Sequence, residues 1–234
     1  MTCRIGNVTH STVWPGPGLF VALSLACTAG MMAARHFGVP RLVLPMTLLA
    51  STGFLFAAWA AGAFQSGRGR LLFLALVGCW TGDLLGPHHF VLGAVCFLLA
   101  HLAFIAAFTL AGFHPRRMCV ASLSAALLAA FLLGFFWPGI PLEERVLVAA
   151  YVLVISGMVV AVAASKSATP LFLAAALLFY LSDIFVARWR YGEGGAMNGY
   201  LCYPLYYLAC NLFALGAGVF ARCGDRRGAP VLTP

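Results

Sequence analysis

The chain has 234 residues, of which 63% are hydrophobic and 9% charged, and its formal net charge is +8. A soluble domain is usually about 45–50% apolar and about 25% charged, so the excess apolar surface must face something other than water. The basic residues stand singly or in pairs at the ends of apolar runs and form no dense patch. This pattern is typical of topology signals at a membrane interface and argues against a nucleic-acid partner.

Apolar runs bounded by Gly, Pro or charged residues follow one another along the whole chain. Because a helix needs ~20 apolar residues to cross the hydrocarbon core, about eight spans with short loops would use this length. We therefore predict an all-α, polytopic integral membrane protein with about eight transmembrane helices in a single transmembrane domain, residues 1–234. The predicted tails are residues 1–16 and 222–234. The predicted spans are Pro17 to Phe37, Leu42 to Phe64, Leu71 to Gly86, Phe90 to Gly112, Met118 to Trp137, Val146 to Ala164, Pro170 to Trp189 and Tyr200 to Ala221.

Orientation follows from the loop charges. The first run is too long for the ~7–15-residue core of a signal peptide, so we expect it to remain as a span. Eight spans place both termini on one side, and the positive-inside rule predicts that this side is cytoplasmic. The side with the termini would carry nine basic residues, namely Arg4, Arg68, Arg70, Arg116, Arg117, Lys166, Arg222, Arg226 and Arg227. The opposite side would carry five, namely Arg35, Arg41, Arg145, Arg188 and Arg190.

Two carboxylic acids lie inside predicted spans, where a polar group is costly and calls for a role. These are Asp83, 13 residues after Arg70, and Asp183, 13 residues after Pro170. At ~1.5 Å per residue both lie about 20 Å along their helices, in the half of the membrane away from the termini. Tyr206 and Tyr207 of the last span share this depth, whereas His101 lies nearer the midplane.

The two acids are also 100 residues apart, each in the third span of a four-span half. This spacing suggests a parallel internal repeat of two four-helix halves, an arrangement that often places a site between the halves. The alternative is that each Asp only hydrogen-bonds neighbouring helices together. No metal or other cofactor is expected, because a single intramembrane His is too few for a zinc site and the cysteines form no C-x-x-C pair. We expect the cysteines to be packing residues.

Two carboxyls in an apolar pocket can hold different protonation states, so that one acts as an acid and the other as an anion. That combination suits hydrolysis through an oxocarbenium-like cation, and it suits proton-coupled transport equally well. Ser182 adjoins Asp183, but the G-x-S-x-G motif of a serine hydrolase is absent.

At these residues the chain resembles the YhhN family of membrane proteins, whose characterised members are lysoplasmalogenases. The first signature reads Gly82-Asp83-Leu-Leu, followed by Gly93-Ala-Val-Cys-Phe97-Leu-Leu-Ala-His101. The second reads Leu181-Ser182-Asp183, followed by Tyr206-Tyr207-Leu208-Ala209-Cys210. There are departures: Cys210 stands where the family usually has Gln, Phe104 where it often has Tyr, and Arg41 with Pro45 where it has Lys-Pro.

The resemblance implies hydrolysis of the vinyl ether bond of lysoplasmalogens to a fatty aldehyde and a glycerophospho-base. Asp83 and Asp183 would then be catalytic, one as proton donor and the other as stabilising carboxylate, with His101, Ser182, Tyr206 and Tyr207 in support. The partners would be a lysophospholipid substrate and membrane lipid, with the headgroup near Arg188 or Arg190. A homodimer stays open.

Two other hypotheses remain. One is a proton-coupled transporter of a small amphiphile that uses the Asp pair as its proton site. The other is a non-catalytic scaffold.

Overall fold

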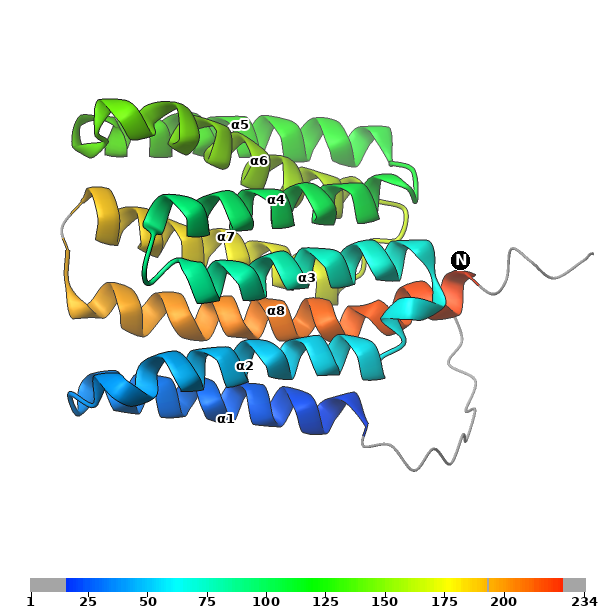
Figure 1. Ribbon diagram of the computed structural model, residues 1–234. Coiled ribbons are helices and arrows are strands. Elements are labelled where there is room, and N and C mark those ends of the chain that lie inside the picture. Colours follow the sequence, from blue (N-terminus) through cyan, green and yellow to red (C-terminus); the bar gives the residue numbers. More distant parts are fainter. Residues whose placement is uncertain (1–15, 193, 225–234) are drawn as a thin grey trace, which may run out of the picture.

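Within residues 16–192 and 194–224, which the computed structural model describes, long α-helices run alternately up and down in one bundle (Figure 1). No strand is assigned in this part of the chain, so the predicted all-α architecture is confirmed. The helices are α1 (Pro17–His36), α2 (Pro40–Ala60), α3 (Gly67–Leu85), α4 (Phe90–Thr109), α5 (Pro115–Phe136), α6 (Arg145–Ala164), α7 (Pro170–Tyr191) and α8 (Ala196–Gly224), with short 3₁₀ turns η1 (Ala63–Gln65), η2 (Trp137–Gly139) and η3 (Leu142–Glu144).

The helix ends follow from local chemistry. Four helices begin with Pro at their first positions, where the missing N–H has no intrahelical partner to lose. The predicted second span is too long at its end, because Gly62 adopts a left-handed φ of 92° and turns the chain into η1. Helix α8 reaches Gly224, so residues 222–224, expected in the C-terminal tail, are still helical. The rest of that tail and residues 1–15 lie outside the described residues.

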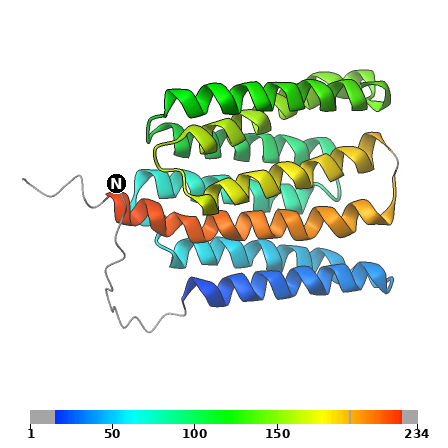
Figure 2. The same cartoon turned by 180° about the vertical axis from the view of Figure 1, so that it is seen from behind.

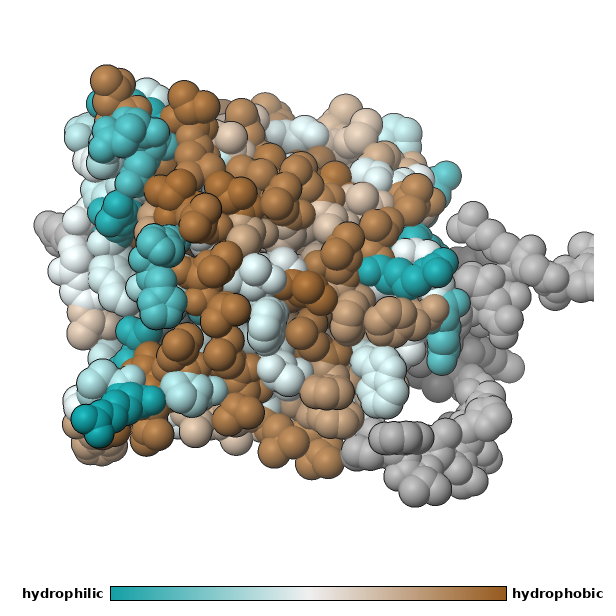
Figure 3. Space-filling view, in the orientation of Figure 1, coloured by the Kyte–Doolittle hydropathy of each residue, from teal (hydrophilic) through white to brown (hydrophobic). Residues whose placement is uncertain are grey.

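The surface of the bundle is that of a membrane protein. Figure 3 shows a broad hydrophobic belt between two more hydrophilic ends. Seven of the described helices are long and apolar enough to cross a membrane, which confirms a multi-pass protein. The exception is α3, whose 19 residues include Arg68, Arg70 and Asp83. It nevertheless lies within the bundle and packs against α2, α4 and α8.

Consecutive helices pair as hairpins, α1 with α2, α3 with α4, α5 with α6 and α7 with α8. Helix α1 begins and α8 ends at the same end of the bundle, and the turns of these four hairpins lie at the other end (Figures 1 and 2). We term these the terminal end and the hairpin end. Helix α2 packs on α8 as α6 packs on α4, which is the relation expected if α1–α4 and α5–α8 are repeated halves.

Aromatic side chains fill the core toward the terminal end. The rings of Phe104 and Phe213 stack with centroids 4.3 Å apart, and those of Phe172 and Phe220 with centroids 5.0 Å apart. Phe108 contacts three of these rings edge-on or tilted, and all five side chains are fully buried. The hollow part of the molecule therefore lies in the other half.

Candidate active site

A cavity of about 1040 Å³ occupies the half of the bundle toward the hairpin end. All eight helices contribute to its wall, which is mainly aliphatic and aromatic. Asp83, Ser182 and Asp183 lie along it, and Gly38, His88 and Ile140 from the turns line it at the hairpin end. The cavity thus connects two carboxyls inside the bundle with one of its ends.

Asp83 projects from the last turn of α3 and is held by hydroxyl groups of two other helices. Its Oδ2 accepts hydrogen bonds from Tyr206 at 2.9 Å and from Tyr207 at 3.4 Å, both on α8. The Ser51 hydroxyl of α2 also donates to this oxygen. Tyr206 and Tyr207, which were predicted to share the depth of Asp83, thus lie beside it. Of the two, only Tyr206 lines the cavity.

Asp183 projects from α7 and has a different set of neighbours. Its Oδ2 accepts a hydrogen bond of 2.9 Å from the Tyr151 hydroxyl of α6. The Nε2 atom of His101, from α4, lies 3.9 Å from the same oxygen. Ser182 donates instead to the backbone carbonyl of Phe179 at 2.7 Å, so its hydroxyl is engaged within its own helix.

The two sites share a sequence relation that supports the repeat. Ser51 precedes Asp83 by 32 residues, and Tyr151 precedes Asp183 by 32 residues. In each half a hydroxyl of the second helix thus binds the carboxyl of the third helix. Sequence reasoning missed both hydroxyls, although scanning for polar residues at the 100-residue offset of the two acids would have paired them.

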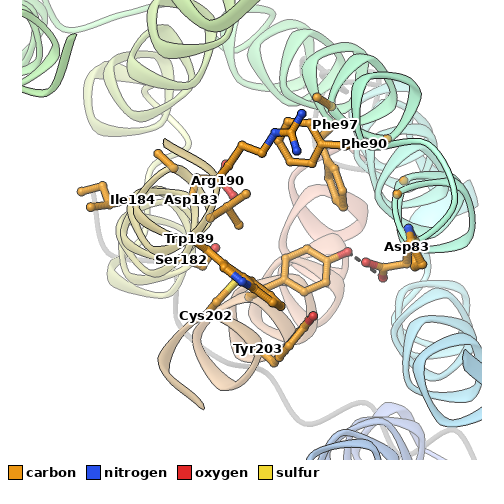
Figure 4. A pocket seen from close by; sticks show the side chains of 18 of the residues that line it. Asp83, Phe90, Phe97, Ser182, Asp183, Ile184, Trp189, Arg190, Cys202 and Tyr203 are labelled. Carbon is orange, nitrogen blue, oxygen red and sulfur yellow. Dashed lines mark hydrogen bonds between the residues drawn. The ribbon is translucent and has the colours of Figure 1, made fainter. Parts of the chain in front are cut away.

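The carboxyls lie on opposite walls of the cavity (Figure 4). Asp83 comes from α3 and Asp183 from α7. The hydrogen bond from Tyr206 reaches Asp83 from α8. The ring of Phe97 contacts the ring of Tyr206 at a centroid distance of 5.7 Å. A ligand in the cavity would therefore have a carboxyl on either side and aromatic rings along the wall.

Arginines stand where the cavity approaches the hairpin end. Arg190 lines it, pairs with Glu144 at 2.7 Å and lies over the Phe90 ring at 4.7 Å. Arg35, which sequence reasoning did not single out, also lines the cavity, and its guanidinium lies 4.6 Å from the centroid of the Tyr203 ring. Arg188 is exposed and is not among the lining residues.

The site is built from carboxyl, hydroxyl and imidazole groups. Within the described ranges, His, Cys, Asp and Glu do not gather in groups of three, and a structural zinc ion takes four such ligands. Of the described cysteines, Cys79, Cys202 and Cys210 are buried, as expected for packing residues, whereas Cys119 is exposed.

Fold and site together define a polytopic α-helical membrane protein with a carboxyl-lined cavity inside the bundle. The family model of the YhhN family matches residues 41–217. This range holds both Asp residues and His101, and the chain belongs to the YhhN family. No curated protein and no solved structure matches the chain.

Proposed function

We propose that the protein is a membrane-embedded hydrolase of the lysoplasmalogenase type, which cleaves the vinyl ether bond of a lysoplasmalogen to a fatty aldehyde and a glycerophospho-base. The observation that supports this most is the pair of carboxyls on opposite walls of an apolar cavity. Enzymes that hydrolyse acetal-type bonds through oxocarbenium-like cations use two carboxyl groups in the same way, one on each side of the reacting bond.

The cavity suits a single-chain lipid. Its volume of about 1040 Å³ lies at the top of the range of ~300–1,000 Å³ that small-molecule sites occupy. Aliphatic and aromatic residues would cover the hydrocarbon chain. Arg35 and Arg190 would face the phosphate of the headgroup at the hairpin end, since a guanidinium binds phosphate oxygens well. Of the two arginines that the resemblance suggested for the headgroup, Arg190 lines the cavity and Arg188 does not, so we assign the headgroup to Arg190.

The reaction needs a proton on carbon and a stabilised cation. One carboxyl gives its proton to the outer carbon of the vinyl ether, which is the alkene carbon not bonded to oxygen. Positive charge develops on the inner carbon, which is bonded to oxygen, and the ether oxygen shares this charge. The opposite carboxylate stabilises that charge in a cavity whose wall is mainly aliphatic and aromatic. Water then adds to the inner carbon, and the hemiacetal breaks into aldehyde and alcohol.

The test is an assay of the purified protein in detergent with an alkenyl lysophospholipid and its ester analogue. The wild type should release fatty aldehyde from the alkenyl lipid. Asp83→Asn and Asp183→Asn should each lower the rate about 100-fold or more, the usual contribution of a positioned acid or base. Correct folding of each variant is checked by its elution as a single species. A variant that keeps most of the wild-type rate would contradict the assignment.

A proton-coupled carrier for a small amphiphile is the second candidate, and the 32-residue spacing that the two halves share favours it. Against it stand the aromatic rings that fill the bundle between the cavity and the terminal end. Proteoliposomes separate the two. Uptake of a lysolipid that follows an imposed proton gradient, without aldehyde release, would favour the carrier.

A further inference from the structure

The two carboxyls differ in what their neighbours can offer. The three side chains that hydrogen-bond to Asp83 Oδ2 among the described residues are hydroxyls, and each can donate a proton to it. Ser51 and Tyr207 have the Thr47 carbonyl as a further acceptor, at 3.0 and 3.4 Å. The Tyr206 hydroxyl donates to Asp83 at 2.9 Å. These donors make the place of Asp83 suitable for a carboxylate anion.

Asp183 faces a nitrogen that has no proton to give. The Nδ1 atom of His101 lies 2.6 Å from the Phe97 carbonyl oxygen, and since a carbonyl only accepts, Nδ1 carries the ring proton. In the neutral ring, Nε2 therefore presents a lone pair. Nε2 is fully buried without a hydrogen-bond partner, and Asp183 Oδ2 lies 3.9 Å from it.

A carboxylate at Asp183 would keep the Tyr151 hydroxyl as a donor, but it would also face the His101 lone pair, and Nε2 would stay without a partner. One proton between the carboxyl and Nε2 removes this conflict. The ring of His101 is completely buried among Phe104, Tyr151 and Phe179. A proton on Nε2 would create an imidazolium beside a carboxylate, and the bundle interior would strip both charges of water. A proton on Asp183 leaves both groups neutral, and a closure of roughly 1 Å lets the carboxyl donate to Nε2.

We infer that Asp183 is the protonated carboxyl of the pair and the proton donor of the reaction, that His101 holds it in this state, and that Asp83 is the anion. The catalytic part of this assignment rests on the proposed hydrolysis, whereas the charge states do not. His101 does not line the cavity, so it acts through Asp183 as a positioning residue.

The assignment fixes the path of the proton. The Asp183 proton forms the new C–H bond at the outer vinyl carbon, which leaves an oxocarbenium ion opposite the Asp83 carboxylate and an ionised Asp183. Water forms the C–O bond to the cationic carbon, and one of its protons returns to Asp183. The remaining hydroxyl proton moves to the glycerol oxygen as the original C–O bond breaks. One water is consumed and the protein regains its starting state.

Infrared spectroscopy of the purified protein, without substrate, tests the charge states. A protonated carboxyl has a carbonyl stretch separate from the carboxylate and amide bands, and this stretch shifts in D₂O. The wild type and Asp83→Asn should show the band, and Asp183→Asn should lack it. The assignment would be overturned if Asp83→Asn lacked the band while Asp183→Asn kept it, or if the wild type showed no such band. Because no turnover is required, this result stands apart from the aldehyde assay of the proposed function.

The role of His101 is tested with His101→Gln. The Asp183 band should move in frequency because its acceptor has changed. In the aldehyde assay kcat should fall by about 10-fold or more while KM stays within a few-fold, since the residue does not touch the lipid. Phe108→Leu, a buried change two turns along the same helix, is the control and should alter neither. An unshifted band with unchanged kcat would overturn the positioning role.

Discussion

Removing the hydroxyl of Tyr206 should slow the reaction without disturbing the fold. In Tyr206→Phe the ring keeps its contacts with Phe97 and Phe179, whose centroids lie 5.7 and 5.3 Å away. What is lost is the 2.9 Å hydrogen bond to Asp83. A hydrogen bond to a charged group contributes about 1.5–3 kcal/mol, and every 1.36 kcal/mol is tenfold in rate. Since water in the cavity can replace part of the bond, we expect kcat to fall about 10- to 100-fold.

Tyr207→Phe is the matched control. Its hydroxyl lies 3.4 Å from Asp83 and equally far from Ser51 and the Thr47 carbonyl, so no single bond is strong. We expect this variant to lose about threefold or less. Both variants are assayed for fatty aldehyde release from an alkenyl lysophospholipid in detergent. Equal losses in the two variants, or full activity of Tyr206→Phe, would refute the view that the Tyr206 bond supports a catalytic anion at Asp83.

Three further variants probe other parts of the structure. Tyr151→Phe removes the 2.9 Å bond to Asp183 and should lower kcat several-fold with little change in KM; an altered KM alone would contradict this. Arg190→Ala should raise KM more than it lowers kcat, because Arg190 lines the cavity about two helical turns beyond Asp183, toward the hairpin end. The same variant loses the ion pair with Glu144, which is worth no more than about 1 kcal/mol of stability because Arg190 is 44% exposed. Gly93→Ala would place a Cβ 2.6 Å from the Cα atom of Gly86, at the end of α3. The thermal unfolding midpoint in detergent should therefore fall, in line with an overpacking cost of about 1–3 kcal/mol. An unchanged midpoint would show that the two helices can move apart to accept the methyl group.

The helices could be predicted because hydrophobicity and breakers act locally. Runs of apolar residues specify membrane helices. Pro170 marks the start of α7, and Gly112, with its positive φ, lies just after the end of α4. The two Asp residues were predictable for a related reason, since a carboxyl within an apolar helix stands out against its surroundings. Ser51 and Tyr151 carry no such contrast, because hydroxyl side chains are common in membrane helices, and only the packing of helices shows what they contact.

Rotation of a helix about its axis also escapes sequence reasoning. Successive residues differ by about 100° around a helix, so neighbours such as Tyr206 and Tyr207 face different surroundings. The same rotation separates Arg190, which lines the cavity, from Arg188, which does not. Hydrophobicity gives little help here, because the lipid-facing and core-facing sides of a membrane helix are both apolar. These orientations depend on contacts between helices far apart in the chain.

The most direct test of the proposed hydrolysis is to run it in D₂O and to analyse the trapped fatty aldehyde by mass spectrometry at early times. Proton transfer to carbon from an exchanged carboxyl predicts one deuterium on the carbon next to the aldehyde group, and no product from the Asp83→Asn, Asp183→Asn double variant. Aldehyde without deuterium, or equal aldehyde release from the double variant, would contradict hydrolysis by the carboxyl pair.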